Sequence, residues 1–162
     1  PKFTFGLTNI INWNNFELSF LLIGSVGGDI VNEFNKSITN IGGTWNIRKD
    51  VWENHWTPEN PNSKFPRIST AYANSMGSYS SKFLYDNSFA RLRNITLGYT
   101  LPKSLLGKFG INTLRVFVQG DNVLTLGSAA RRGTDPEQDI SGTTDNRFPT
   151  TKSVSFGLQL NL

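Results

Sequence analysis

Side chains that could perform acid–base or nucleophilic chemistry are few in this sequence. The one histidine, His55, has no serine or cysteine motif around it, so a packing role in a loop is favoured over that of a catalytic base. Glu53 and Glu59 could serve as a glycosidase pair, but nothing in their spacing requires it. Cysteine is absent, and no glycine-rich phosphate loop followed by Lys-Ser/Thr occurs. The sequence therefore predicts a protein that is not an enzyme, with no catalytic residue, no metal and no cofactor.

Two groups of residues could instead bind a ligand. Asp135-Pro136-Glu137 with Asp139 has the carboxylates of a calcium cluster, but Asp-Pro favours a turn, and the turn is the preferred interpretation. Trp45, Trp52 and Trp56 fall in one long polar stretch, where they could stack on a sugar. The alternative, that these tryptophans fold the loop or form an interface, is favoured over ligand binding.

The elements that must position these residues are five segments with the alternation of β-strands, at about 2–11, 16–26, 87–100, 112–125 and 151–162. In the final one, Val154, Phe156, Leu158, Leu160 and Leu162 form an unbroken apolar face opposite serine, glycine, glutamine and asparagine. About ten residues of period two match one bilayer crossing of a tilted strand. A soluble edge strand is usually shorter and carries a charge or proline on its exposed side.

The connections between these segments sort by length. Those at 12–15 and 101–111 are short, and those at about 27–86 and 126–150 are long and polar, with two short helices expected at 30–38 and 50–56. Long connections on one side and short ones on the other are typical of an outer-membrane barrel, whose extracellular loops are long. Arg91, Arg93 and Arg115 then face the lumen or the rims. The modest net charge of +4, with scattered Lys and Arg, gives no basis for nucleic-acid binding.

A second interpretation remains open, that of a secreted all-β carbohydrate-binding module with exposed tryptophans. The two differ in the environment of Val154, Phe156, Leu158 and Leu160. A transmembrane barrel turns these side chains to lipid, whereas a soluble sandwich buries them in a core.

Several linked motifs carry a resemblance to a known family. They are Ser88-Phe89-Ala90-Arg91-Leu92-Arg93-Asn94-Ile95-Thr96-Leu97-Gly98-Tyr99, Leu101-Pro102, Leu114-Arg115-Val116-Phe117-Val118-Gln119-Gly120-Asp121-Asn122, Asp135-Pro136-Glu137 and Ser155-Phe156-Gly157-Leu158. In order and spacing they resemble the C-terminal signature of the SusC/RagA family of TonB-linked outer-membrane transporters of Bacteroidetes. One departure is Leu162, where family members usually end in an aromatic residue.

The resemblance implies a fold, a location and partners. Residues 1–162 would be the C-terminal part of a TonB-dependent receptor β-barrel, namely the last five antiparallel strands of a 22-stranded transmembrane barrel in the cell outer membrane. Its partners would be the remainder of the barrel and its plug domain, a SusD-like surface lipoprotein, the TonB complex and outer-membrane lipid. The parent protein would import oligosaccharides or peptides.

Overall fold

A computed structural model describes residues 1–39, 46–69, 81–107, 110–128, 133–137 and 150–161. The chain divides into two compact units, one of residues 1–28, 86–136 and 148–162 and the other of residues 29–85 and 137–147. No helix in the described part of the chain combines the length and apolar character needed to span a bilayer.

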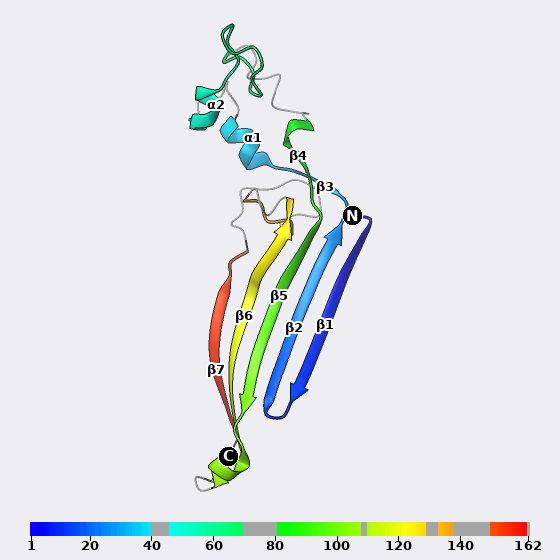
Figure 1. Cartoon of the computed structure of the whole chain (residues 1–162), viewed down its shortest axis with the longest axis vertical. Helices are drawn as coiled ribbons and strands as arrows, with labels where there is room; N and C mark the ends of the chain where they lie inside the picture. Colours follow the sequence, from blue (N-terminus) through cyan, green and yellow to red (C-terminus); the bar gives the residue numbers. More distant parts are fainter. Residues whose placement is uncertain (40–45, 70–80, 108–109, 129–132, 138–149, 162) are drawn as a thin grey trace. The chain divides into compact units, whose positions relative to one another are not determined.

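The first unit is one antiparallel sheet of five long strands (Figure 1). The strands run at Phe3–Trp13 (β1), Phe16–Val26 (β2), Phe89–Thr100 (β5), Thr113–Gly127 (β6) and Ser153–Asn161 (β7). They lie side by side in the order β1-β2-β5-β6-β7, so each pairs with its neighbour along the sheet. The sequence predicted an all-β antiparallel structure, and the described sheet confirms that class.

The register of the strands collects the apolar side chains on one side of the sheet. Ile11, for example, pairs with Leu18, which pairs with Leu97, and that row continues through Val118 to Phe156. Because alternate residues of a strand point to opposite faces, every second position joins the same side. We call this side the apolar face; it comprises Phe3, Phe5, Leu7, Ile11, Trp13, Phe16, Leu18, Phe20, Leu22, Val26, Leu92, Ile95, Leu97, Tyr99, Leu114, Val116, Val118, Leu124, Leu126, Val154, Phe156, Leu158 and Leu160.

An irregularity in β5 keeps this pattern intact. Leu22 of β2 pairs with Leu92, while the preceding Leu21 pairs with Asn94, so Arg93 is an extra residue in the ladder. Such a bulge shifts the alternation by one position. Leu92 and Ile95 therefore share the apolar face although three positions separate them in the sequence.

Strand ends are staggered across the sheet in the way that a tilted barrel requires. A row drawn from the start of β7 at Ser153 reaches β1 at Thr8, five residues past the start of that strand. At the other end, the row from Trp13 reaches Leu158, three residues before the end of β7. With about 3.3 Å per residue and about 4.8 Å between strands, these offsets correspond to a tilt of about 27° to 41°. Membrane barrels have tilts of about 35–45°.

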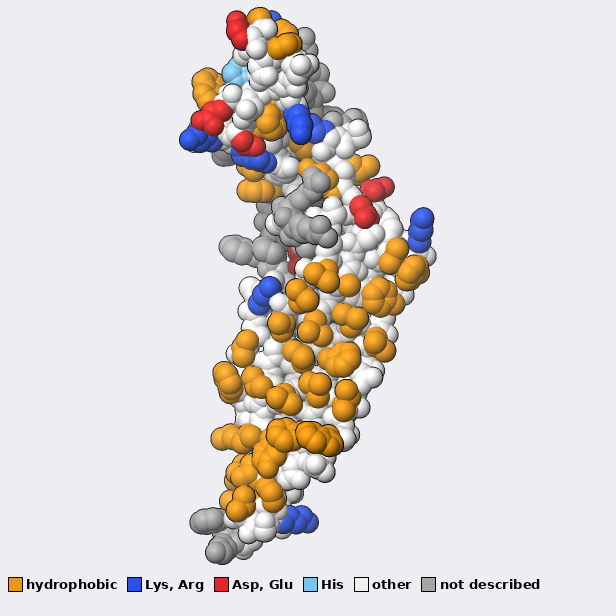
Figure 2. Space-filling model, in the orientation of Figure 1, with side chains coloured by type: hydrophobic (Ala, Val, Ile, Leu, Met, Phe, Trp, Pro, Cys, Tyr) orange, Lys and Arg blue, Asp and Glu red, His pale blue; other side chains and the backbone are white. Residues whose placement is uncertain are grey.

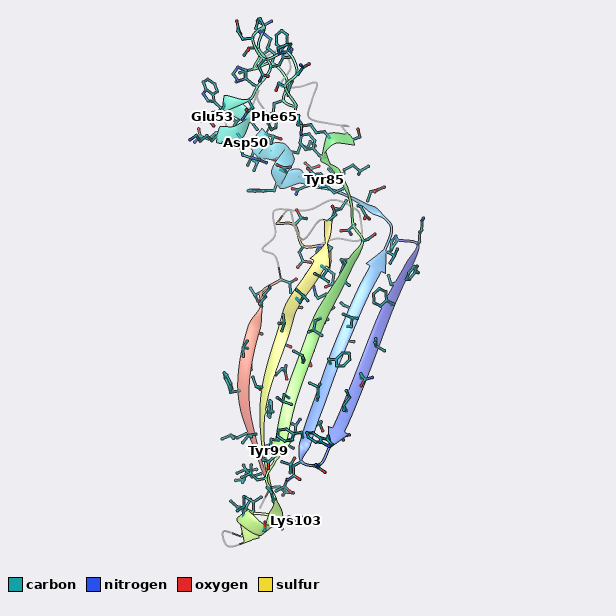
Figure 3. The ribbon with its side chains drawn as sticks, in the orientation of Figure 1. Asp50, Glu53, Phe65, Tyr85, Tyr99 and Lys103 are labelled. Carbon is teal, nitrogen blue, oxygen red and sulfur yellow. The ribbon has the colours of Figure 1, made fainter. Side chains whose placement is uncertain are left out.

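Both short connections lie at the same end of the sheet. Asn14 turns the chain between β1 and β2 with a positive φ of 52°, a conformation that asparagine tolerates. Asn15 donates from Nδ2 to the carbonyl of Thr100, 2.8 Å away, which ties this turn to the end of β5. The helix α3 (Lys103–Leu106) lies in the connection from β5 to β6, and its Lys103 lies beyond Tyr99 at that end (Figure 3). The long connections therefore leave from the opposite end.

The described residues of the second unit form short elements. Its described part holds β3 (Asp29–Val31) paired with β4 (Leu84–Asp86), the helices α1 (Glu33–Thr39) and α2 (Lys49–Glu53), and a single 3-10 turn, η2 (Ser81–Phe83). The two helices overlap the ranges expected from the sequence. Ile30, Val51 and Phe83 are its buried apolar side chains among the described residues.

Candidate functional site

The apolar face extends across all five strands of the sheet, and many of its side chains are exposed. Phe156 is 83% exposed, Leu158 75% and Val154 66%, although each lies within a regular strand. Figure 2 shows apolar side chains spread over one face of the sheet. Soluble proteins rarely leave so continuous an apolar surface open to water, whereas a membrane barrel requires it. This exposure agrees with the barrel interpretation and contradicts the soluble sandwich, which placed these side chains in a core.

Aromatic side chains gather at both ends of the apolar face. Phe16 lies 4.7 Å from Tyr99 and 6.3 Å from Trp13, centroid to centroid, at the end with the short connections. Phe3 and Phe5 lie 6.4 Å apart at the other end. Ten residue steps separate Phe3 from Trp13 on β1. At about 3.3 Å per step and a tilt of about 35°, this span is about 27 Å high, close to the band of about 25 Å between the aromatic girdles of membrane barrels.

The opposite side of the sheet, which we call the polar face, carries most of the charged and hydrogen-bonding groups of the strands; Asn9, which pairs with Phe20, is an exception. The members of the polar face are Thr4, Thr8, Asn12, Glu17, Ser19, Ser25, Arg91, Asn94, Thr96, Thr100, Arg115, Gln119, Asp121, Thr125, Ser153, Ser155, Gln159 and Asn161, together with a few apolar residues. In a barrel this face borders the lumen, where water and polar protein groups solvate charge.

One ion pair on the polar face spans three strands. Arg115 of β6 donates from Nη2 to a carboxylate oxygen of Glu17 on β2, 2.6 Å away. Gly98 of β5 lies between them, and a methyl group there would come within 2.7 Å of the guanidinium. The missing side chain at Gly98 therefore lets Arg115 cross β5. The ring of Phe117 similarly lies over Gly157 of β7, where no side chain opposes it.

A second polar cluster surrounds Asp121 in the middle of the sheet. Its carboxylate accepts hydrogen bonds from Asn94 at 2.7 Å, from Ser153 at 3.2 Å and from Gln119 at 3.2 Å. These donors come from β5, β6 and the start of β7. The cluster therefore joins three neighbouring strands through one acceptor.

The third group is a buried ion pair at the end of the sheet with the long connections. Arg91 donates from Nη2 to Asp135 at 2.5 Å, and their side chains are only 4% and 3% exposed. The other oxygen of Asp135 accepts from the backbone amide of Thr150 at 2.9 Å. The carboxylate predicted as part of a turn thus binds an arginine. Within the described residues no group of three or more candidate ligands could hold a metal, and Asp139 lies outside them.

In the second unit, the histidine considered for catalysis lies beside one of the tryptophans considered for ligand binding. Trp52 is 60% exposed, and its ring lies 5.8 Å from that of His55. His55 also contacts the carbonyl of Trp52 through Nδ1, which agrees with a packing role. Trp56 is half-buried, and Trp45 lies outside the described residues.

The two glutamates considered as a glycosidase pair also have separate roles. Glu53 forms an ion pair with Lys49 within one helical turn of α2, with 3.5 Å between the charged atoms. Hydrogen bonds from its own backbone amide and from Thr57 lower the pKa of Glu59 from its usual value. A glycosidase general acid requires a raised pKa, so Glu59 is shifted in the wrong direction for that role.

Comparison with known proteins agrees with the geometry. The chain is 34% identical over 163 residues to TonB-dependent receptor P3 of Formosa agariphila, an alignment that covers all of this chain and 15% of the relative. TonB-dependent receptor P26 of the same organism is 26% identical over 170 residues, covering 99% of this chain and 17% of the relative. The chain is homologous to TonB-dependent receptors. No family model matches it.

Solved structures extend this homology to three dimensions. The RagAB peptide importer in its open-open state superposes with a TM-score of 0.81 at 28% identity, over 98% of this chain and 17% of that one. Its closed-closed state gives a TM-score of 0.81 at 29% identity, over 97% and 17%. These findings confirm the predicted resemblance to the SusC/RagA family. This homologue of TonB-dependent receptors spans about a sixth of the length of the proteins it matches, and its location is the cell outer membrane, as predicted.

Two features of the site were missed by sequence reasoning. Arg91 and Asp135 were noted in separate motifs, but 44 positions separate them and no local pattern pairs them. The second is Gly98, which was noted only as one residue of the motif from Ser88 to Tyr99. Gly98 pairs with Glu17 on one side, and Arg115 lies two residues from its partner Phe117 on the other, so its role is visible only once the register is known.

Proposed function

We propose that this chain forms part of the wall and the extracellular connections of a TonB-dependent importer of the SusC/RagA type. In that assignment β1, β2, β5, β6 and β7 are the last five strands of a 22-stranded barrel, and residues 27–86 and 126–150 lie outside the cell. Ligand would be captured outside, and TonB-driven displacement of the plug would admit it to the periplasm. The chain itself performs no bond-making or bond-breaking step.

The observation that carries this proposal is the division of the sheet into two chemically opposite faces. Lipid covers an apolar face of this height without leaving polar groups unsatisfied where the backbone groups of neighbouring strands bond to one another. The ion pairs of Glu17 with Arg115 and of Arg91 with Asp135 lie on the polar face. A lumen that passes hydrophilic solute requires this arrangement.

Its partners follow from the incomplete edges of the sheet. β1 and β7 stand at the ends of the strand order, and each has one edge without a partner among the described strands. Hydrocarbon does not tolerate open edges, so both must pair with further strands of the barrel. A plug domain, the TonB complex and a SusD-like surface lipoprotein acting as a lid complete the proposed assembly.

The cargo is an oligosaccharide or a peptide. The similar solved structures are those of a protein named as a peptide importer, which supports a peptide as the cargo. The exposed Trp52, with Trp45 and Trp56, supports a sugar, because aromatic rings stack on the apolar faces of sugars. We assign these three tryptophans as candidate ligand contacts.

Uptake by whole cells tests the proposal. Cells lacking the parent gene, and the same cells complemented with it, would be offered fluorescent oligosaccharides and fluorescent peptides of similar size. We expect uptake of one class to depend on the gene and to stop when a protonophore removes the energy source of TonB. Equal uptake of both classes with and without the gene would contradict an import function.

A further inference from the structure

The buried pair of Arg91 and Asp135 joins parts of the chain that the strand ladder does not connect. Arg91 lies on β5, where it pairs with Ile23 of β2 and with Thr125 of β6. Asp135 lies eight positions after the end of β6, within the long connection to β7. The row of Arg91 belongs to the polar face, so the described segment 133–136 is held on that side of the sheet and not on the lipid side.

Hydrogen bonds around the pair satisfy both charged groups. Arg91 also donates from Nε to the hydroxyl of Thr125 at 3.0 Å. Asp135 accepts from the amide of Thr150, where the same connection returns to β7. Asn87 donates from Nδ2 to the carbonyl of Pro136 at 3.0 Å. Two charges removed from water are stable only with such a complete set of partners.

These contacts fix the direction of the connection. If the segment only connected β6 to β7, hydrogen bonds at the ends of these two strands would be sufficient. Here Asp135, in the outgoing part, binds Arg91 on the polar face, and Thr150, in the returning part, donates to the same carboxylate of Asp135. Thr134, Asp135 and Pro136 are all buried, which agrees with a segment folded against the sheet.

We propose that the ion pair of Arg91 and Asp135 is a latch, which holds segment 133–136 on the luminal side of the wall at the extracellular mouth. The segment, and not the ends of β5 and β6, then borders the entrance through which solute passes. This inference rests on the proposed barrel, because only a barrel makes the polar face a lumen. Asp135 acts as a positioning residue and needs no contact with the solute.

Thiol accessibility in intact cells tests the latch in the full-length receptor. Thr134→Cys would be labelled from outside with a small membrane-impermeant maleimide. We expect slow labelling in the otherwise unchanged protein and labelling at least tenfold faster when Asp135→Asn is added. Glu137→Gln, which removes the same charge from an exposed neighbour, should leave the rate unchanged within twofold and serves as the matched control.

A second variant addresses misfolding, since Asp135→Asn leaves the Arg91 charge buried without its partner. Arg91→Met with Asp135→Asn removes both charges and should also label at least tenfold faster. As a check on folding, single cysteines along β7 would be introduced into each variant and labelled in parallel samples. In a folded barrel their labelling alternates between lumen-facing and lipid-facing positions. An intact alternating pattern with an unchanged Thr134 rate would overturn the latch alone. Loss of the alternating pattern in the unmutated receptor would overturn the barrel.

Discussion

A charge placed on the apolar face should destabilise the protein far more than the same charge one residue away. Phe156 and Ser155 are neighbours on β7, and they face opposite sides of the sheet. Phe156 lies near the middle of its strand, which in the proposed barrel is near the bilayer midplane. An arginine at the midplane on the lipid face costs about 2–4 kcal/mol. We expect Phe156→Arg to lower the free energy of unfolding by this amount.

This energy corresponds to a large change in the folding equilibrium. At about 1.36 kcal/mol per factor of ten, the unfolded fraction should rise about 30-fold to about 900-fold. Ser155→Arg places the same side chain on the solvated polar face and should change the free energy of unfolding by no more than about 0.5 kcal/mol. Phe156→Leu keeps an apolar group at the site and separates the loss of the ring from the gain of the charge.

The assay is a denaturant titration of the full-length receptor in lipid vesicles, followed by tryptophan fluorescence. The ranking of the two arginine variants decides the outcome. If Ser155→Arg destabilised the receptor as much as Phe156→Arg, or more, the assignment of the two faces would be refuted.

Further predictions concern the polar face and the second unit. Gly157→Ala would press a methyl group against the ring of Phe117, so we expect a loss of about 1–3 kcal/mol in the same titration, recovered in part by Phe117→Leu. Glu17→Gln should cost no more than about 1 kcal/mol, because its pair with Arg115 is partly exposed, and the effect should shrink at high salt. Trp52→Ala should raise the apparent KM for uptake of the cargo about 2-fold to 13-fold, which corresponds to about 0.5–1.5 kcal/mol for one aromatic contact, and should leave the stability unchanged. An unchanged KM would remove Trp52 from the ligand contacts.

Much of the sheet could be predicted because its signal is local. The alternation of Val154, Phe156, Leu158 and Leu160 depends only on the period of two, which an extended chain imposes without reference to the remainder of the fold. The lengths of the connections then placed the turns and the loops on opposite sides. The described strands lie close to the ranges that this reasoning gave.

The features that escaped prediction depend on long-range register. The bulge at Arg93 shifts the alternation by one, and an extra residue of this kind has no distinct local pattern. Glu17 and Arg115 are 98 positions apart, and they meet because Gly98, which pairs with Glu17, leaves room for the Arg115 guanidinium to cross β5. Asp135 was interpreted as a turn residue from its Asp-Pro step, because the arginine that binds it lies on a distant strand.

The environment of the apolar face is the central claim, and single cysteines along β7 test it most directly. The chain contributes no cysteine of its own, so spin labels can be placed one at a time from position 153 to position 161. In the full-length receptor in lipid vesicles, collision rates would be measured with oxygen, which partitions into lipid, and with a water-soluble nickel complex. We predict that oxygen collisions peak at 154, 156, 158 and 160, which face lipid. Collisions with the nickel complex should peak only at the positions between these four, which face the lumen, wherever the complex reaches the lumen. Low collision rates with both reagents at 154, 156, 158 and 160 would mean a buried core and would contradict the account.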